Sequence, residues 1–346
     1  MFFAGVRMTR AISLALQGGG SHGAFTWGVL DRLLEDERVH VEALSGTSSG
    51  AMNAAILTAG YARGGAAGAR DALERFWRTI SEYSSLSPVQ RNWTDHLTGT
   101  WNLDSSPGYL WSNWFSSLFS PYQTNPFNLH PLRDILRQQL DIDALHACTD
   151  IRIFVAATNV RTGRARVFQR EDVTIDALLA SACLPHIYQA VEIDGEAYWD
   201  GGYMGNPAIW PLIYNTETAD VVLVQINPLR RESVPRTPSE IANRLDEIAF
   251  NSSLMHEMRA IAFVQRLLEQ DALREPVASR YKNVRMHMLS DEAGIAALGP
   301  SSKANAERNF VTHLKNLGRA CAEQWLTRHY DDLGKRSSLN IRETFL

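Results

Sequence analysis

The stretch "ALQGGGSHGAF", Ala15–Phe25, joins two different hydrophobic patterns through a run of glycines. The apolar run at 11–16 is short and uninterrupted, which is typical of a buried parallel strand. After the glycines, apolar residues recur at helical spacing over 22–37, with charged residues between them. These patterns predict a strand, a glycine loop and a helix in succession.

The next residues repeat this arrangement with a different turn. A run rich in β-branched residues at 39–44 predicts a second strand, and an alanine-rich stretch at 51–60 predicts a helix. The tight turn between them reads "GTSSG", Gly46–Gly50. Two successive strand–loop–helix units indicate an α/β fold with a mainly parallel central sheet flanked by helices.

The rest of the chain alternates short apolar runs with longer helical patterns. Strands are expected at 151–160, 165–169, 219–227 and 285–289, with hairpin turns at 162–163 and 194–195. Helices are expected around 73–80, at 132–140, at 174–185 where Pro185 ends the helix, at about 239–270, and near the C-terminus. The apolar stripe of the long helix consists of Ile241, Leu245, Ile248, Met255, Met258 and Ile261.

The composition is that of an ordinary globular protein of 346 residues with a formal net charge of −4. Its basic residues are scattered, so we expect no nucleic-acid partner. Cys148, Cys183 and Cys321 lack metal-ligand spacing and favour free thiols in a reducing compartment. The apolar run at 11–16 is too short for a signal peptide or a membrane span. We therefore expect a soluble, cytoplasmic protein.

Ser48 occupies the centre of the Gly-x-Ser-x-Gly pattern formed by Gly46–Gly50. In this motif a sharp strand-to-helix turn exposes the serine hydroxyl, and the flanking glycines let the backbone bend. The helix N-terminus also favours negative charge that develops beside the serine. The alternative is a serine-rich helix cap, but the strand and helix predicted on either side favour a nucleophile.

A serine nucleophile needs a base, and the sequence offers two kinds of candidate. Histidine is the usual partner, and His22 lies in the glycine loop while His186 follows Pro185. Asp200 is the alternative, because the glycines at 201–202 let another backbone approach its carboxylate closely. Taken alone, an Asp-Gly-Gly sequence also fits an ordinary turn.

The glycine loop fits two chemistries. The amides of Gly18, Gly19 and Gly20 can converge on the oxygen of a tetrahedral intermediate, where one such donor is worth about 2.7–4 kcal/mol. The loop also matches the dinucleotide-binding fingerprint, written here Gly18-x-Gly20-x-x-Gly23. That alternative requires an acidic residue at the end of the second strand, and the nearest one, Glu42, comes too early. An oxyanion hole is therefore favoured over nucleotide binding.

Together, "GGGSHG", "GTSSG" and "DGG" resemble the motifs of the patatin-like phospholipases, lipid acyl hydrolases with a serine–aspartate dyad. The resemblance implies a three-layer architecture, Ser48 as nucleophile, Asp200 as its base, and glycines 18–20 as the oxyanion hole. It also implies that Gly46 and Gly50 shape the nucleophile elbow and that His22 and Gly23 support the loop. His22 replaces the arginine or lysine usual in the family, so it would support the loop partly protonated or by hydrogen bonding alone.

The resemblance extends over about 11–228 and carries further expectations. We expect a catalytic core over 1–230 and a mainly helical portion over 231–346 packed on the same domain. The substrate would be a lipid acyl ester, with no metal or organic cofactor and no need for calcium. The sequence leaves open a second hypothesis, a non-catalytic lipid- or granule-binding protein of the same fold.

The segment 85–130 differs from the rest of the chain because it is rich in aromatic residues and poor in charge. Tryptophan is favoured at bilayer interfaces, so this segment can cover an apolar cleft and contact a membrane or lipid surface. Trp111, Trp114 and Phe115 are the residues we expect at such a lid or interface. The alternative is that these rings pack over the sheet as ordinary core.

Overall fold

The computed structural model describes residues 9–85, 87, 89–270 and 272–346, and within them eight strands form one sheet. Its order is β5-β6-β3-β2-β1-β7-β8, with β4 also paired to β3. The strands are β1 (Arg10–Leu16), β2 (Val39–Gly46), β3 (Arg152–Asn159), β4 (Ala165–Gln169), β5 (Val191–Ile193), β6 (Glu196–Asp200), β7 (Asp220–Val224) and β8 (Arg285–Leu289). The pairs from β3 through β2, β1 and β7 to β8 are parallel, and β4, β5 and β6 pair antiparallel. The predicted mainly parallel α/β sheet is confirmed.

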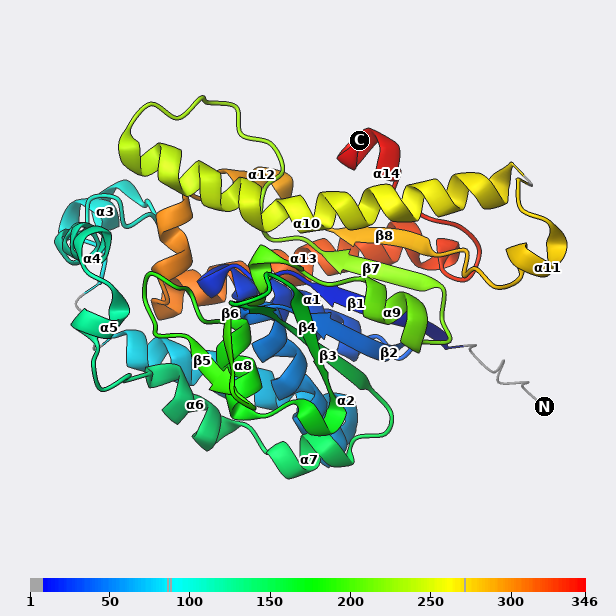
Figure 1. Cartoon of the computed structure of the whole chain (residues 1–346), viewed down its shortest axis with the longest axis horizontal. Helices are drawn as coiled ribbons and strands as arrows, with labels where there is room; N and C mark the ends of the chain where they lie inside the picture. Colours follow the sequence, from blue (N-terminus) through cyan, green and yellow to red (C-terminus); the bar gives the residue numbers. More distant parts are fainter. Residues whose placement is uncertain (1–8, 86, 88, 271) are drawn as a thin grey trace, which may run out of the picture.

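Helices lie on both sides of this sheet, as Figure 1 shows. The α-helices are α1 (Gly23–Glu35), α2 (Ser49–Ser84), α3 (Trp93–Thr98), α4 (Pro107–Leu118), α5 (Pro121–Thr124), α6 (Pro131–Gln139), α7 (Ile142–Ala147), α8 (Ile175–Ser181), α9 (Trp210–Asn215), α10 (Pro238–Glu269), α11 (Glu275–Ala278), α12 (Glu292–Ala296), α13 (Arg308–His329) and α14 (Ile341–Phe345). Short 3-10 helices are η1 (Gly20–His22), η2 (Arg170–Asp172), η3 (Gly201–Tyr203), η4 (Pro300–Ala304) and η5 (Tyr330–Asp332). None of the helices in the described ranges is long and apolar enough to cross a bilayer.

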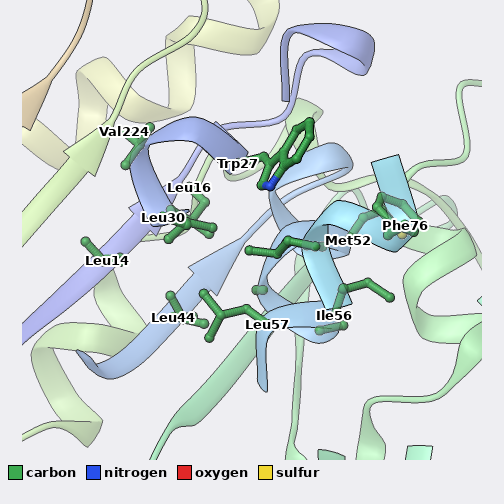
Figure 2. Close-up of a cluster of buried hydrophobic side chains, with 14 of the residues drawn as sticks. Leu14, Leu16, Trp27, Leu30, Leu44, Met52, Ile56, Leu57, Phe76 and Val224 are labelled. Carbon is green, nitrogen blue, oxygen red and sulfur yellow. The ribbon is translucent and has the colours of Figure 1, made fainter. Parts of the chain in front are cut away.

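The central strands are buried on both faces, and their side chains alternate between two hydrophobic clusters. Leu14 and Leu16 of β1 belong to the cluster beneath α1, α2 and α13, and Figure 2 shows Leu16 beside Leu30 of α1. Ala15 points the other way, into the cluster under α9, α10 and α14. Because successive strand residues face opposite sides of the sheet, a layer of helices on each side is needed to shield the side chains of β1 from water.

Two helical patterns in the sequence form one long element. The stretches at 51–60 and 73–80 both lie in α2, which has non-helical backbone at Gly64 and Gly65. Gly65 adopts a φ of +60°, a conformation that glycine reaches without a steric cost. This kink lets one continuous segment pack first beside β2 and then beside the pocket described below.

One helix boundary and the cover of one helix face differ from the sequence-based expectations. The helix α8 ends at Ser181, several residues before Pro185, because the chain turns there to bring Cys183 against β6. On α10, Ile241, Leu245 and Ile248 are 45%, 62% and 51% exposed, although the predicted stripe placed them in the core. The reason is that the first half of α10 extends beyond the sheet, as Figure 1 shows, whereas Met258 in the second half is fully buried.

The residues beyond 230 share the hydrophobic core with those before it. The strand β8 pairs with β7 along its whole length, and α13 packs closely on α1 through two glycines. A Cβ at Gly28 would collide with the carbonyl oxygen of Lys315, and a Cβ at Gly318 would collide with that of Phe25. The two helix backbones are therefore in direct contact, which only glycine permits.

This contact predicts the effect of adding one methyl group to α13. We expect Gly318→Ala to lower the free energy of unfolding by about 1–3 kcal/mol, because the new Cβ pushes α13 away from α1. Urea unfolding followed by circular dichroism measures the change. Gly64→Ala is the matched control, since a Cβ there meets nothing within 4 Å. Equal stability of the wild type and Gly318→Ala would contradict the close packing.

Candidate active site

Ser48 lies between the end of β2 and the start of α2, in a backbone conformation rarely adopted by residues other than glycine. Its φ is +52° and its ψ is −121°. Its amide donates to Ser181 Oγ at 3.0 Å, and Gly50 donates to the Thr47 carbonyl at 2.8 Å. Such strain costs of order 1–3 kcal/mol and persists only where the surrounding structure enforces it.

The glycines on either side of Ser48 are required by close backbone contacts. A Cβ at Gly46 would lie 2.5 Å from the carbonyl oxygen of Gly50, and a Cβ at Gly50 would collide with that of Leu16. The turn is thus pressed against the end of β1, where the glycine loop begins. Gly23 is equally close, since a Cβ there would lie 2.7 Å from Ser49 Cβ. The first turn of α1 therefore packs against the serine turn.

Asp200 ends β6 and is completely buried. Its Oδ1 accepts a hydrogen bond from the Gly202 amide at 2.7 Å. Burial raises the pKa of Asp200 to about 7, and the Gly202 amide and the Ser48 hydroxyl each oppose this rise. Ser48 and Asp200 line the same pocket. However, Oδ2 has no hydrogen-bond partner of ordinary geometry among the described residues.

The glycine loop crosses the carboxyl ends of β1 and β2. The Gly18 amide donates to Asn206 Oδ1 at 2.7 Å and the Gly19 amide donates to Ser49 Oγ at 3.1 Å. Gly19 and Gly20 line a pocket together with Ser48, and Gly18 does not. The N–H groups of Gly18 and Gly19 are therefore both engaged within the protein, by Asn206 and by Ser49, and only the acceptor of Gly19 lies in the pocket.

His22 is buried behind the loop and does not act on Ser48. Its Nε2 lies 2.7 Å from Ser302 Oγ, and its ring meets Phe310 edge to face. Burial and the positive charge of Lys303 lower the pKa of His22 to about 3, so the ring is neutral near pH 7. The His22 side chain therefore contributes no positive charge behind the loop.

The pocket that contains Ser48 and Asp200 has a volume of about 680 Å³, within the range typical of ligand sites. One part of its wall is apolar and comes mainly from α2, α6 and the loop after α8. These residues are Met52, Phe76, Trp77, Ile80, Leu132, Ala182, Leu184 and Ile187. The wall also includes polar side chains, namely His186, Asn227, Asn243, Asp246, Glu247 and Lys303. The cavity wall therefore offers apolar surface for an acyl chain together with several polar groups.

The predicted cover segment contains three short helices, of which α4 borders the pocket through Tyr109. On the same helix, Trp111 and Trp114 are 64% and 54% exposed, with their rings 5.5 Å apart. They are not part of a rigid core, which was the alternative interpretation of this segment. The side chain of Phe115 lies outside the described residues.

A separate cluster combines serine, histidine and aspartate, but it has a structural role. His287 lies 3.0 Å from Asp220 Oδ1 and 2.9 Å from Ser338 Oγ. The Asp220 carboxylate also accepts two hydrogen bonds from Arg285, and the Gly334 N–H donates to both of its oxygens, at 3.1 and 3.0 Å. These contacts hold the pKa of Asp220 well below its usual range and fasten the C-terminal loop to β7. None of these residues lines the Ser48 pocket.

Several residues at the site carry no signal in the sequence. Asn206, Asn227 and Lys303 lie outside the recognised motifs, yet all three contact the glycine loop. Ser181 lies in the stretch before Asp200 and holds the Ser48 amide. Among the described residues, no group of three or more histidine, cysteine, aspartate or glutamate side chains could hold a metal ion.

The fold and the site define a class of α/β proteins in which a glycine loop and a strained serine turn share the carboxyl edge of one parallel sheet. The family model described as patatin-like phospholipase matches residues 14–213, and the chain belongs to this family. The resemblance seen in the three sequence motifs is thereby confirmed. The family is generally hydrolytic, which supports a lipid hydrolase function for this chain.

Comparison with solved structures finds VipD from Legionella pneumophila, at 15% sequence identity and a TM-score of 0.39. The match covers 93% of this chain and 67% of that one. No curated protein matches the chain in sequence.

Proposed function

We propose that the chain hydrolyses carboxylic esters of lipids through an acyl intermediate on Ser48, with Asp200 as the general base. The observation that carries this proposal is the pairing of two unusual groups in one pocket. Ser48 is held in a strained turn, and the carboxylate beside it is fully buried with its pKa raised to about 7. Strain and a perturbed pKa at one cleft are typical of catalytic groups.

In the first half of the reaction, ionised Asp200 accepts the proton of the Ser48 hydroxyl while Oγ attacks the ester carbonyl. A base whose pKa lies near the working pH is both largely ionised and strong enough to accept this proton. The C–O bond of the ester then breaks, and the alcohol leaves with the proton that Asp200 had accepted. The acyl group remains bonded to Ser48 Oγ.

In the second half, water replaces the alcohol. Asp200 takes a proton from the water as its oxygen attacks the acyl carbonyl, and then returns that proton to Ser48 Oγ as the acid departs. The negative oxygen of both tetrahedral intermediates would be stabilised by the amides of Gly19 and Gly20, which line the pocket beside Ser48. For this, the Gly19 N–H would exchange its hydrogen bond to Ser49 Oγ for one to the oxyanion. The N-terminus of α2 adds favourable dipole charge at the same place.

The wall of the pocket supports a substrate with an acyl chain. Its apolar part is formed by large side chains such as Phe76, Trp77 and Leu132, in the same pocket as Ser48. Hydrolysis of p-nitrophenyl esters of increasing chain length by the wild type, Ser48→Ala and Asp200→Asn tests the proposal. Equal rates for all three proteins would overturn it and would favour the non-catalytic lipid-binding alternative.

We also propose that the mouth of the pocket contacts a lipid surface. Both α4 and α10 contribute to the pocket, through Tyr109 and Phe250, and both present large apolar side chains to solvent. Those more than 40% exposed on the two helices include Leu110, Trp111, Trp114, Leu118, Ile241, Leu245 and Ile248. An exposed apolar rim around an acyl pocket fits a lipid surface, because the substrate can then pass from lipid to pocket without crossing water.

This rim predicts the behaviour of a double tryptophan variant. We expect Trp111→Ala/Trp114→Ala to bind phosphatidylcholine vesicles roughly ten- to hundredfold more weakly than the wild type, because it loses apolar area that enters the lipid. Vesicle sedimentation measures the affinity, and thermal unfolding checks the fold. Tyr214→Ala is the matched control, since Tyr214 is 79% exposed on α9 and does not line the pocket. Unchanged binding by the tryptophan variant would place the contact elsewhere.

A further inference from the structure

Lys303 reaches the glycine loop from η4, far along the chain. Its carbonyl oxygen lies against Gly20, where a Cβ would come within 2.5 Å. Its ammonium donates to Asn227 Oδ1 at 2.8 Å, and both residues line the Ser48 pocket. A half-buried lysine whose ammonium lies next to a candidate oxyanion loop needs an explanation, because even partial burial disfavours the charge.

Asn227 connects this ammonium to the loop in a defined orientation. Its side-chain amide donates to the Gly18 carbonyl at 2.7 Å and to Gln17 Oε1 at 3.2 Å. Gln17 Oε1 also accepts the backbone amides of Ile226 and Asn227. The amide oxygen of Asn227 is therefore directed at Lys303 and its nitrogen at Gly18.

The carbonyl of Gly18 and the amide of Gly19 belong to the same peptide group. A donor that pulls on the carbonyl oxygen shifts charge through this group, so that the Gly19 N–H becomes a stronger donor. A cation at the far end of the chain of hydrogen bonds increases the shift. Gly19 lines the pocket beside Ser48, and its N–H donates to Ser49 Oγ at 3.1 Å at the edge of that pocket. The stronger N–H would act on the oxyanion by exchanging this hydrogen bond for one to the negative oxygen.

We propose that Lys303 is a positioning residue that strengthens the oxyanion hole, acting through Asn227 on the Gly18–Gly19 peptide. This inference rests on the proposed acyl-transfer function. The positive charge beside the loop thus comes from Lys303 and not from His22, whose ring is neutral near pH 7.

The charges around Lys303 agree with a role for the cation at the loop. Glu247 is already paired with Arg231 at 2.6 Å and with Arg244 at 3.1 Å. Asp246 and Glu247 both act favourably on the Lys303 charge from a distance, and Arg231 opposes it. The hydrogen bond of the ammonium is made to the neutral Asn227, so Lys303 is not simply one half of an ion pair.

The test compares the full-length wild type with three variants in the hydrolysis of a soluble p-nitrophenyl ester. Lys303→Met removes the charge, Lys303→Arg keeps it, and Asn227→Asp keeps an acceptor for Lys303 while losing the donor to Gly18. We expect Lys303→Met and Asn227→Asp each to lower kcat roughly ten- to hundredfold with little change in KM, less than the loss of a whole oxyanion donor. Lys303→Arg should keep most of the wild-type kcat.

The double variant shows whether both residues act along one path. If they do, Lys303→Met/Asn227→Asp will have about the kcat of the poorer single variant, because the second change removes nothing further. A wild-type kcat in either single variant, losses that multiply in the double variant, or an effect confined to KM would each overturn the inference. If Lys303→Met fails to fold, Lys303→Gln replaces it, with the same outcomes.

Failure of this inference and failure of the proposed function give different results. If the wild type hydrolyses the ester no faster than Ser48→Ala, the proposed function itself is overturned. An active wild type, an inactive Ser48→Ala and an undiminished Lys303→Met would leave the function standing and remove the role of Lys303. Thermal unfolding midpoints of all variants separate a loss of activity from a loss of fold.

Discussion

Replacing Ser48 by alanine is expected to lower kcat for p-nitrophenyl ester hydrolysis by roughly 10⁴- to 10⁶-fold. The size follows from known serine hydrolases, in which loss of the nucleophile leaves only the contribution of the oxyanion hole and of binding. The hydroxyl is also the only group at the centre of the turn that can form the acyl intermediate. Initial rates of p-nitrophenol release measure the change, and labelling with a fluorophosphonate probe reports the nucleophile directly.

The neighbouring serine provides the control for this experiment. Ser49 begins α2, and its hydroxyl accepts the Gly19 amide at 3.1 Å without occupying the strained position. We expect Ser49→Ala to lose no more than about tenfold in kcat, the scale of one hydrogen bond, and to keep probe labelling. Probe labelling of Ser48→Ala at the wild-type rate would show that the nucleophile is another residue.

Asp200→Asn is expected to lower kcat by roughly 10²- to 10⁴-fold, because asparagine cannot accept the proton of Ser48. The pKa of Asp200 near 7 also predicts the pH dependence of the wild type. The base acts only when ionised, so kcat/KM should rise with pH and level off above about pH 7. A profile that is flat between pH 5 and 8 would contradict a base role for this carboxylate.

The same substitution should make the protein more stable at alkaline pH. The pKa of Asp200 is about 7 in the folded protein and about 3.8 when unfolded, so the folded state binds the proton more tightly. The stability of the wild type therefore falls as pH rises from about 4 to about 7, by up to about 1.4 kcal/mol per pH unit for this one group. Asparagine is neutral throughout and still presents an oxygen to the Gly202 amide.

Urea unfolding at pH 5 and pH 8 measures this effect. The quantity compared is the free energy of unfolding of Asp200→Asn minus that of the wild type. We expect this difference to be about 2–4 kcal/mol larger at pH 8 than at pH 5, since other titrating groups cancel in the comparison. A stability difference that is equal at both pH values would show that burial does not raise the pKa of Asp200. If Asp200 lowers the stability of the folded protein and is also needed for activity, a functional reason for keeping this carboxylate is indicated.

Much of the site was accessible from local sequence patterns. The strand, turn and helix around Ser48 depend on residues that are neighbours in the chain, and "GTSSG" supplies both the bend and the hydroxyl. The Asp194-Gly195 turn was likewise predictable. Both residues adopt a positive φ, which aspartate and glycine tolerate better than most residues do. The glycine loop lies beside Ser48, as the pattern predicted, although the engagement of the Gly18 amide by Asn206 was not foreseen.

Periodicity was a less reliable guide to what covers a helix face. The apolar stripe of α10 was recognised correctly, but the sheet beneath it ends before Ile241, Leu245 and Ile248. Helical spacing reports which residues share a face and carries no information on how far the neighbouring layer extends. The residues of this stripe that lie beyond the sheet are exposed, and they form part of the proposed lipid surface.

The sequence by itself determined the strand–loop–helix units, the serine turn and the family. Only the tertiary structure decided that Asn206, Asn227 and Lys303 gather behind the glycine loop and that His22 is buried and neutral. Turns and helices follow from short-range steric preferences, which the neighbouring residues express directly. Contacts between residues two hundred positions apart, and the burial that sets their charges, exist only after the sheet has brought distant segments together.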